Sequence, residues 1–74
     1  MAKSALNIVK NNLGRNVKEL RLSSNMSQTD LAVKAKVRQS LISKMESGKG
    51  NPTLDSIVKI ARALGVTVIE LLDS

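Results

Sequence analysis

The sequence predicts an all-α fold, a compact bundle of five helices, and three observations support this class. Apolar residues recur at helical spacing in five segments, and residues typical of helix caps precede most of them. The connections between the segments are short, as in helical bundles. The 74 residues include no aromatic side chain, so the core consists of aliphatic residues and methionine. A chain of this length is expected to form one domain, over residues 1–74.

The first helix is predicted over residues 4–24, with Ser4 as its N-cap. Its apolar positions are three or four residues apart, as one buried helix face requires; they are Leu6, Val9, Leu13, Val17 and Leu20. A glycine inside a helix costs about 1 kcal/mol relative to alanine. A break in this helix between Asn11 and Gly14 is therefore an alternative to one continuous helix.

Two short helices follow, at residues 28–35 and 39–46, with a very short connection between them. Ser27 and Asp30 form a near capping box for the first of the two. So short a connection makes the two helices cross sharply, as in a helix-turn-helix. The motif is predicted at about residues 28–47.

A fourth helix is predicted at residues 54–64, after a loop rich in glycine at residues 47–52. Thr53 is its N-cap. Gly65 suits the left-handed residue that commonly follows the last turn of a helix.

The fifth helix is short and ends near Asp73, and Thr67 with Glu70 provides a full capping box for it. It is apolar on more than one face. One face must pack on the domain, and the surplus predicts self-association as a homodimer. The predicted interface consists of Val66, Val68, Ile69 and Leu72. The alternative, a helix that only docks on its own core, stays open.

Positive charge is concentrated in the middle of the chain. The net charge is +6 overall, and residues 34–49 alone contribute +4, from five basic residues and Glu46. A polyanionic partner is one interpretation, and a solvated basic surface is the other. The exposed positions of the third helix all carry groups that can hydrogen-bond to base edges or phosphates. They are Arg38, Gln39, Ser40, Ser43 and Lys44.

Several function classes are disfavoured by composition. The chain has no cysteine and no histidine, so disulfides, the commonest zinc ligands and the usual general base are absent. It also lacks paired carboxylates and a glycine-rich phosphate loop, so we expect neither an enzyme nor a bound cofactor or metal. No apolar run approaches the length of a membrane span. Single-stranded RNA readers usually stack bases on aromatic residues, which this chain does not have.

Four motifs occur in a fixed order along the chain. They are Leu20-Arg21; Met26-Ser27-Gln28 with Leu31-Ala32; Ile42-Ser43 with Met45-Glu46, Gly48 and Pro52; and Ile60-Ala61 with Ala63-Leu64-Gly65-Val66. Together, over about residues 13–73, they resemble the phage repressor/Cro-type (Xre-like) helix-turn-helix DNA-binding domain. The resemblance implies a bundle of the phage-repressor type, with helices 2 and 3 forming the motif. It also implies that helix 3 lies in the major groove of double-stranded DNA.

The resemblance also implies roles for individual residues. Base contacts would come from Gln39, Ser40, Ser43 and Lys44. Backbone contacts would come from Gln28, Lys36, Arg38 and Lys49. Arg21 and Glu46 match the positions of the family's structural ion pair, although two unrelated surface charges are the alternative. Gln39 is the leading candidate for base readout because a glutamine amide pairs bidentately with adenine.

Two residues depart from the family pattern. Members usually have glycine at Lys36, where the turn tends to need a left-handed residue, and a lysine there costs roughly 1 kcal/mol or more. Either the turn is wider in this chain or Lys36 tolerates the strain. Members often have serine or threonine at Arg38, and the loss of that cap costs about 1 kcal/mol.

The predicted function is sequence-specific DNA binding by a cytoplasmic, nucleoid-associated transcription repressor. It would bind a short pseudo-palindromic operator as a homodimer. An antitoxin with a toxin partner, or another protein-interaction module with this fold, is the alternative. Whether the chain is a complete Cro-like or restriction-modification controller-like protein, or the head of a longer repressor, is open.

Overall fold

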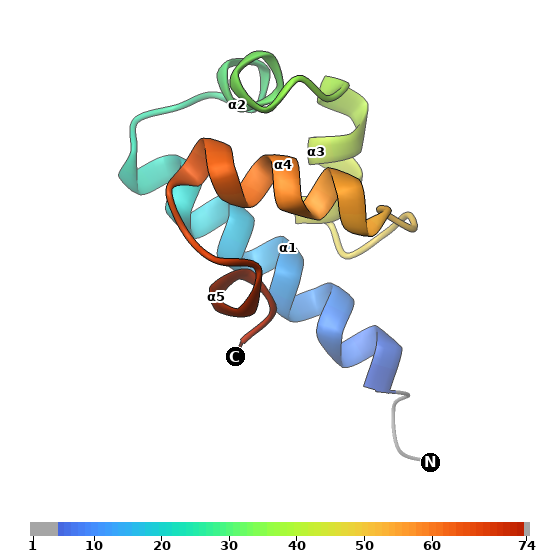
Figure 1. The fold of residues 1–74 in the computed structure, drawn as a ribbon. Helices are drawn as coiled ribbons and strands as arrows, with labels where there is room; N and C mark the ends of the chain where they lie inside the picture. Colours follow the sequence, from blue (N-terminus) through green and yellow to red (C-terminus); the bar gives the residue numbers. More distant parts are fainter. Residues whose placement is uncertain (1–4, 74) are drawn as a thin grey trace.

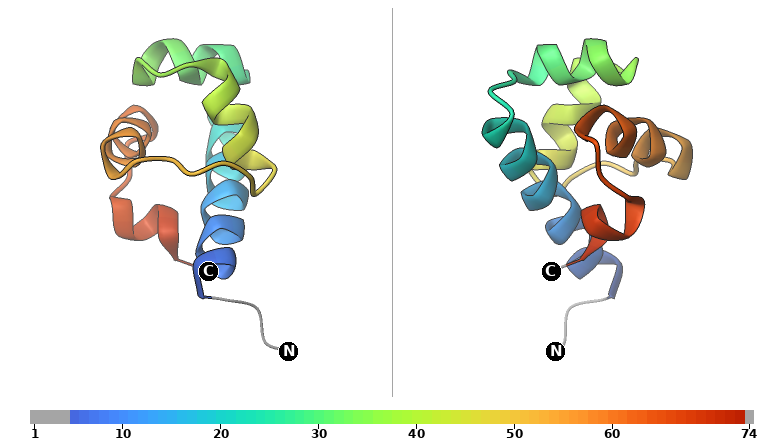
Figure 2. Two further views of the ribbon diagram at one scale, coloured as in Figure 1. Left: turned by 90° about the vertical axis from the view of Figure 1, so that its right-hand side faces the viewer. Right: turned by 60° about the vertical axis from the view of Figure 1, so that its left-hand side comes forward.

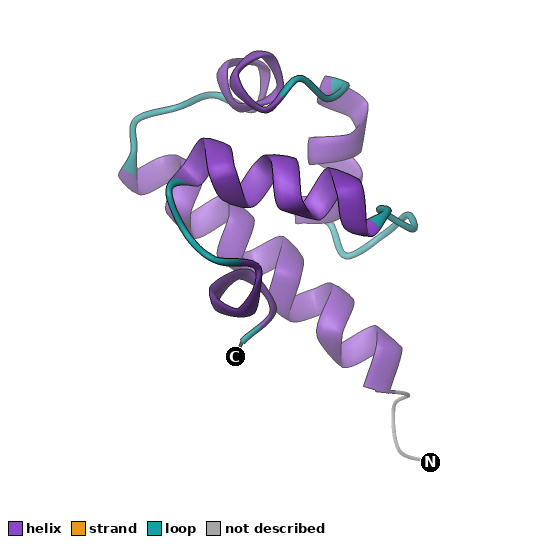
Figure 3. Ribbon diagram, in the orientation of Figure 1, coloured by secondary structure: helices purple, strands orange, loops and turns teal. Residues whose placement is uncertain are grey.

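Five α-helices form within residues 5–73, the part of the chain that the computed structural model describes, and these residues contain no strand. The helices are α1 (Ala5–Ser23), α2 (Gln28–Ala35), α3 (Gln39–Glu46), α4 (Leu54–Leu64) and α5 (Val68–Leu72) (Figures 1 and 3). The predicted all-α class with five helices is confirmed. The predicted cap Ser4 lies outside the described residues, as does the side chain of Leu6.

The long helix α1 is the support on which the other helices are arranged. It packs against α3 and α5, while α2 crosses α3 and α4 at the far end of the molecule (Figure 1). The views in Figure 2 show α5 beside the N-terminal half of α1, at the opposite end from α2. The molecule is elongated, with principal extents of 38 × 21 × 20 Å.

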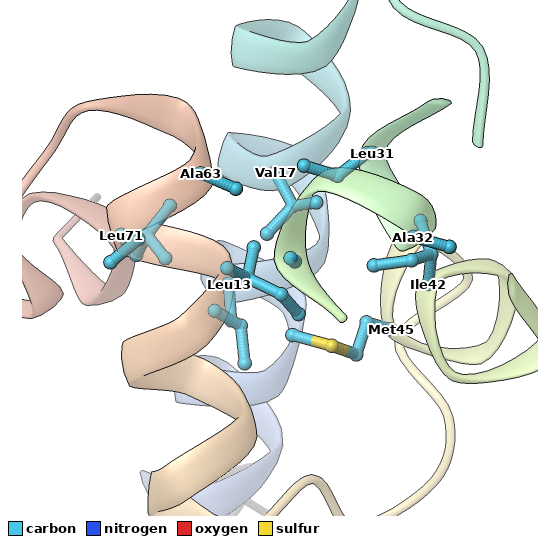
Figure 4. Close-up of a cluster of buried hydrophobic side chains, with 11 residues drawn as sticks. Leu13, Val17, Leu31, Ala32, Ile42, Met45, Ala63 and Leu71 are labelled. Atoms are coloured by element: carbon cyan, nitrogen blue, oxygen red, sulfur yellow. The ribbon is translucent and has the colours of Figure 1, made fainter. Parts of the chain in front are cut away.

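All five helices contribute to one aliphatic core, which Figure 4 shows in close-up. The largest side chains that are fully buried in it are Leu31, Ile42, Met45, Ile60, Leu71 and Val17. The predicted apolar face of α1 is only partly buried. Leu13 and Val17 reach the core, but Val9 is 38% exposed. The prediction of Val9 as a buried position is therefore wrong, because the first turns of α1 extend past most of the bundle (Figure 1).

Helix α1 is continuous, so the break considered between Asn11 and Gly14 does not occur. Gly14 is buried where α1 touches α3. A Cβ atom at this position would lie 2.1 Å from the carbonyl oxygen of Met45. No side chain fits at that distance, so the glycine permits close packing of the two helices.

Local capping chemistry explains where the short helices begin. The hydroxyl of Ser27 accepts a hydrogen bond from the Asp30 N–H, and the Asp30 carboxylate accepts one from the Ser27 N–H. The predicted capping box of α2 is confirmed. The Thr67 hydroxyl accepts from the Glu70 N–H at 3.1 Å. Within the described chain the return bond is not formed, so α5 has half of its predicted box.

Four of the helices end in the same way, with a left-handed residue and a hydrogen bond across the last turn. The left-handed residues are Asn25, Lys36, Gly48 and Gly65. In each case the next N–H donates to the carbonyl five residues earlier, at 2.8–3.1 Å. The prediction of Gly65 as such a residue is confirmed. Lysine is the residue in this set that pays the largest conformational cost.

Candidate nucleic-acid interface

Helix α3 is divided into a buried side and an exposed polar side. Ile42 and Met45 lie in the core. The residues predicted to contact bases are all exposed, and their spacing puts them on one face of the helix; they are Gln39, Ser40, Ser43 and Lys44. The structure thus brings these four side chains together on the outer surface of α3.

Arg21 and Glu46 form a bidentate ion pair that joins α1 to the last turn of α3. Arg21 Nε lies 2.7 Å from Glu46 Oε2, and Nη2 lies 2.9 Å from Oε1. The two side chains are only 10% and 5% exposed. The hydrogen bond to Glu46 raises the pKa of Arg21, against the opposing effect of burial. Arg21 Nη1 also donates to the carbonyl of Met26 at 2.8 Å, which holds the loop before α2.

A chain of hydrogen bonds runs from this ion pair to the start of α3. Gln28 Nε2 donates to Glu46 Oε1 at 3.2 Å, and Gln39 Nε2 donates to Gln28 Oε1 at 3.1 Å. A glutamine amide has two N–H donors and one carbonyl acceptor. Gln39 therefore has a second N–H and its carbonyl oxygen for another partner, while Gln28 orients it. Residue types alone did not reveal that Gln28 links the ion pair to Gln39.

The turn between α2 and α3 is short, and Lys36 adopts the left-handed conformation with φ 59° and ψ 45°. Of the two alternatives for this turn, the strained lysine is the one observed, and the turn is not widened. The Val37 N–H closes the turn on the carbonyl of Ala32 at 3.0 Å. Arg38 occupies the N-cap position of α3 without a side-chain cap hydrogen bond, as its residue type predicts.

The predicted backbone contacts surround α3. Lys36 and Arg38 are exposed before its first turn, and Lys49 is exposed after its last turn. The Lys49 N–H donates to the carbonyl of Lys44 at 2.8 Å, which fixes the main chain on which Lys49 is carried. Gln28 is half-buried beside Glu46. The α3 face is therefore flanked by cationic side chains.

The predicted dimer residues differ strongly in exposure. Ile69 is 77% exposed. The other three, Val66, Val68 and Leu72, are half-buried and pack against the core of their own chain. The apolar surplus of α5 is thus concentrated at Ile69.

Asn16 has a role that the sequence did not suggest. Its side-chain amide donates to the carbonyl of Leu71 at 2.8 Å and to that of Asp73. These bonds satisfy carbonyls at the C-terminal end of α5 and fasten that helix to α1. No local signal marks Asn16, because its partners are main-chain atoms 54 or more residues away in sequence.

Neither a metal site nor a membrane span is found in the described part of the chain. No three side chains of histidine, cysteine, aspartate or glutamate come together there to hold an ion. None of the helices in residues 5–73 has the length and hydropathy needed to cross a bilayer.

The fold and the α3 surface agree with comparisons to known proteins. The model of the helix-turn-helix family HTH_3 matches residues 17–71. The chain belongs to this family. The chain is also similar to control protein C.BamHI from Bacillus amyloliquefaciens. The two are 48% identical over 61 residues, which are 81% of this chain and 75% of that protein.

Two solved structures show the same HTH_3-type architecture. The restriction-modification controller protein C.AhdI from Aeromonas hydrophila matches with a TM-score of 0.77 and 34% identity, covering 86% of this chain and 94% of that one. The biofilm regulator SinR, solved in complex with DNA, matches with a TM-score of 0.77 and 34% identity, covering 82% and 98%. The predicted Xre-like helix-turn-helix family and its fold are confirmed.

Proposed function

We propose that this HTH_3 protein is a sequence-specific DNA-binding transcription regulator that acts as a repressor. The observation that carries the proposal is the exposed polar face of α3, held to the core through Arg21, Glu46 and Gln28. A reading helix must be rigid to discriminate between bases, and this chain of contacts supplies that rigidity. The SinR–DNA complex supports DNA as the partner.

Within this proposal the side chains divide into two groups. Gln39 pairs with adenine, Lys44 reaches guanine or a phosphate, and Ser40 and Ser43 add short contacts to base edges. Sequence-independent contacts to the phosphates fix the register of the protein on the duplex. They would come from Gln28, Lys36, Arg38 and Lys49.

We further propose that the protein binds as a homodimer through α5. Ile69 would be the centre of the interface, with Val66, Val68 and Leu72 around it. A twofold dimer places two reading helices about 34 Å apart, one turn of B-DNA. The operator is then a short pseudo-palindrome. Occupation of promoter DNA by such a dimer excludes polymerase and represses transcription.

The similarity to C.BamHI and C.AhdI favours a role in controlling restriction-modification genes over a role as an antitoxin. We propose no catalytic activity and no cofactor, since the α3 surface needs neither to bind DNA. Because the proposed partner is genomic DNA, we also propose a cytoplasmic location on the nucleoid, with residues 1–74 working as one DNA-binding domain.

In vitro selection of bound DNA from a random pool, combined with sedimentation of the complex, tests this function. We expect one enriched motif with twofold symmetry, bound by two protein chains. Gln39→Ala and Lys44→Ala should weaken and relax that preference at fixed salt, whereas Lys18→Ala on α1 should not. If no motif is enriched, or if the α3 variants select the same motif with the same affinity, α3 is not the reader.

A further inference from the structure

Two surface hollows adjoin each other along α2, α3 and α4. The first has a volume of about 480 Å³, and its polar lining includes Lys36, Arg38, Ser40, Lys44, Ser56 and Lys59. The second has a volume of about 430 Å³ and is lined by Lys34, Ala35, Lys36, Lys59, Arg62 and Ala63. Lys36 and Lys59 line both hollows, so the two form a continuous surface. The left-hand view of Figure 2 shows this side of the molecule, with α2 at the top and α3 and the start of α4 below it on either side.

This surface is strongly basic, and we call its six cationic residues the basic track. They are Lys34, Lys36, Arg38, Lys44, Lys59 and Arg62, and all are exposed. No acidic residue of the described chain lines either hollow. Asp55 pairs with Lys59 at 3.2 Å across one turn of α4, but both side chains are well exposed. Such a pair contributes little, so Lys59 stays available to another anion.

We propose that the basic track holds the sugar–phosphate backbone of DNA beyond the segment that α3 reads. Lys34, Lys59 and Arg62 are then additional phosphate contacts, on α2 and α4 rather than on the reading helix. The inference rests on the proposed function, because the first hollow borders the α3 face at Ser40 and Lys44. A backbone strand leaving that face meets the shared residues Lys36 and Lys59 and then the second hollow.

The chemistry of the second hollow favours a nucleic acid backbone over an acidic protein. Ala35 and Ala63 are the only apolar residues that line it, and the other four lining residues are lysines or arginine. Protein interfaces depend on a few large buried anchors, above all aromatic ones, and no large apolar residue lines this hollow to form a pocket for them. Phosphates need closely spaced cations and no such pocket.

The experiment compares two double variants of the 74-residue protein that carry the same change in charge. Lys34→Gln with Arg62→Gln removes two cations of the second hollow. Arg15→Gln with Lys18→Gln removes two exposed cations of α1 that line neither hollow. Each pair loses one lysine and one arginine, which lowers the net charge from +6 to +4. Circular dichroism melts establish that both variants are folded.

The measured quantity is the slope of log affinity for the selected operator against log salt concentration. Each lost phosphate contact makes this slope shallower by about 0.9, so we expect a change of about 1.8 for the track pair and little change for the α1 pair. The preference for operator over random duplex should stay as in the wild type, because phosphate contacts carry no sequence information. Adding Lys59→Gln should make the slope shallower again.

Equal slopes for the two double variants would overturn the inference. The basic track would then bind no DNA backbone, and an acidic protein could be its partner instead. A track pair that loses operator preference would overturn it as well, since these residues would then take part in base readout. These results leave the proposed function standing as long as the wild type selects a symmetric motif. Failure of the wild type to select any motif is instead a failure of the proposed function.

Discussion

The contributions of Lys36 and Gly14 to stability depend on the main chain rather than on side-chain contacts. At Lys36 the backbone conformation matters, and at Gly14 a neighbouring carbonyl group matters. Lys36 has the left-handed conformation that Asn25, Gly48 and Gly65 adopt at the other helix ends. Gly14 is inside a right-handed helix, where alanine would normally be better, but the Met45 carbonyl occupies the space of a Cβ atom. At one position the family's usual glycine is missing, and at the other a glycine is required by packing.

The variant Lys36→Gly is expected to raise the free energy of unfolding by up to about 1 kcal/mol. Glycine relieves the left-handed strain, although its more flexible unfolded state cancels part of the gain. Urea denaturation measures the difference. The matched control is Lys34→Gly, two residues earlier within α2, which should lower stability by about 1 kcal/mol. If Lys36→Gly lowers the free energy of unfolding as Lys34→Gly does, Lys36 is not strained.

At the scale of elements, α1 is attached to the helix-turn-helix by one set of contacts and to α5 by another. The ion pair between Arg21 and Glu46 connects the end of α1 to the end of α3. Asn16, in the middle of α1, bonds the last carbonyls of α5. The proposed reading surface and the proposed dimer helix are therefore attached to the same helix, α1, by different side chains, and each attachment can be tested separately.

Removal of the anion by Glu46→Ala should lower the free energy of unfolding by about 3–5 kcal/mol, because Arg21 is left buried without its partner. The measurement is equilibrium unfolding in urea at neutral pH. Asp55→Ala breaks the exposed pair with Lys59 and should change stability by less than about 1 kcal/mol. If Glu46→Ala and Asp55→Ala lower the free energy of unfolding by similar amounts, the buried Arg21–Glu46 pair contributes no more to stability than an exposed pair.

The substitution Asn16→Asp should destabilise the protein by about 1–3 kcal/mol, because it replaces a donor with an acceptor next to the carbonyls of α5. Hydrogen exchange should show the loss of protection first in α5. Asn12→Asp is the control one turn earlier: the Asn12 side chain only accepts a bond from Arg15, and an aspartate accepts as well. Unchanged exchange in α5 for Asn16→Asp would contradict the assigned role.

At the scale of the whole molecule, two distant surfaces have different tasks in the proposed function. Helix α3 lies towards one end of the molecule, and α5 lies beside the N-terminal half of α1 towards the other (Figure 1). A dimer through α5 leaves both α3 faces free. The most exposed large apolar residue of α5, Ile69, is the one whose alteration should affect assembly without affecting the monomer fold.

We expect Ile69→Asp to shift the protein towards the monomer in sedimentation while its melting temperature stays close to that of wild type at low concentration. A carboxylate buried in an apolar interface without a partner is costly, and an exposed one is not. Val33→Asp is the control, since Val33 is 74% exposed on α2. Equal sedimentation of wild type and Ile69→Asp would argue against α5 as the dimer surface.

Much of the fold follows from interactions that act over a few residues. Apolar spacing and cap chemistry depend on positions at most five residues apart, so the bounds of α2, α3 and α4 were predictable from the sequence. The exposed polar side of α3 followed from the same spacing, because its buried side was recognisable. The resemblance to the helix-turn-helix family then supplied roles for these residues.

The tertiary structure decided what depends on partners far apart in sequence. The continuity of α1 at Gly14, the bonds from Asn16 to α5 and the link from Glu46 through Gln28 to Gln39 each join groups that only the folded chain brings together. The same holds for the basic track, whose residues come from three helices and one turn. Local sequence determines which helices form, whereas steric fit and hydrogen bonding between helices determine which of their side chains meet.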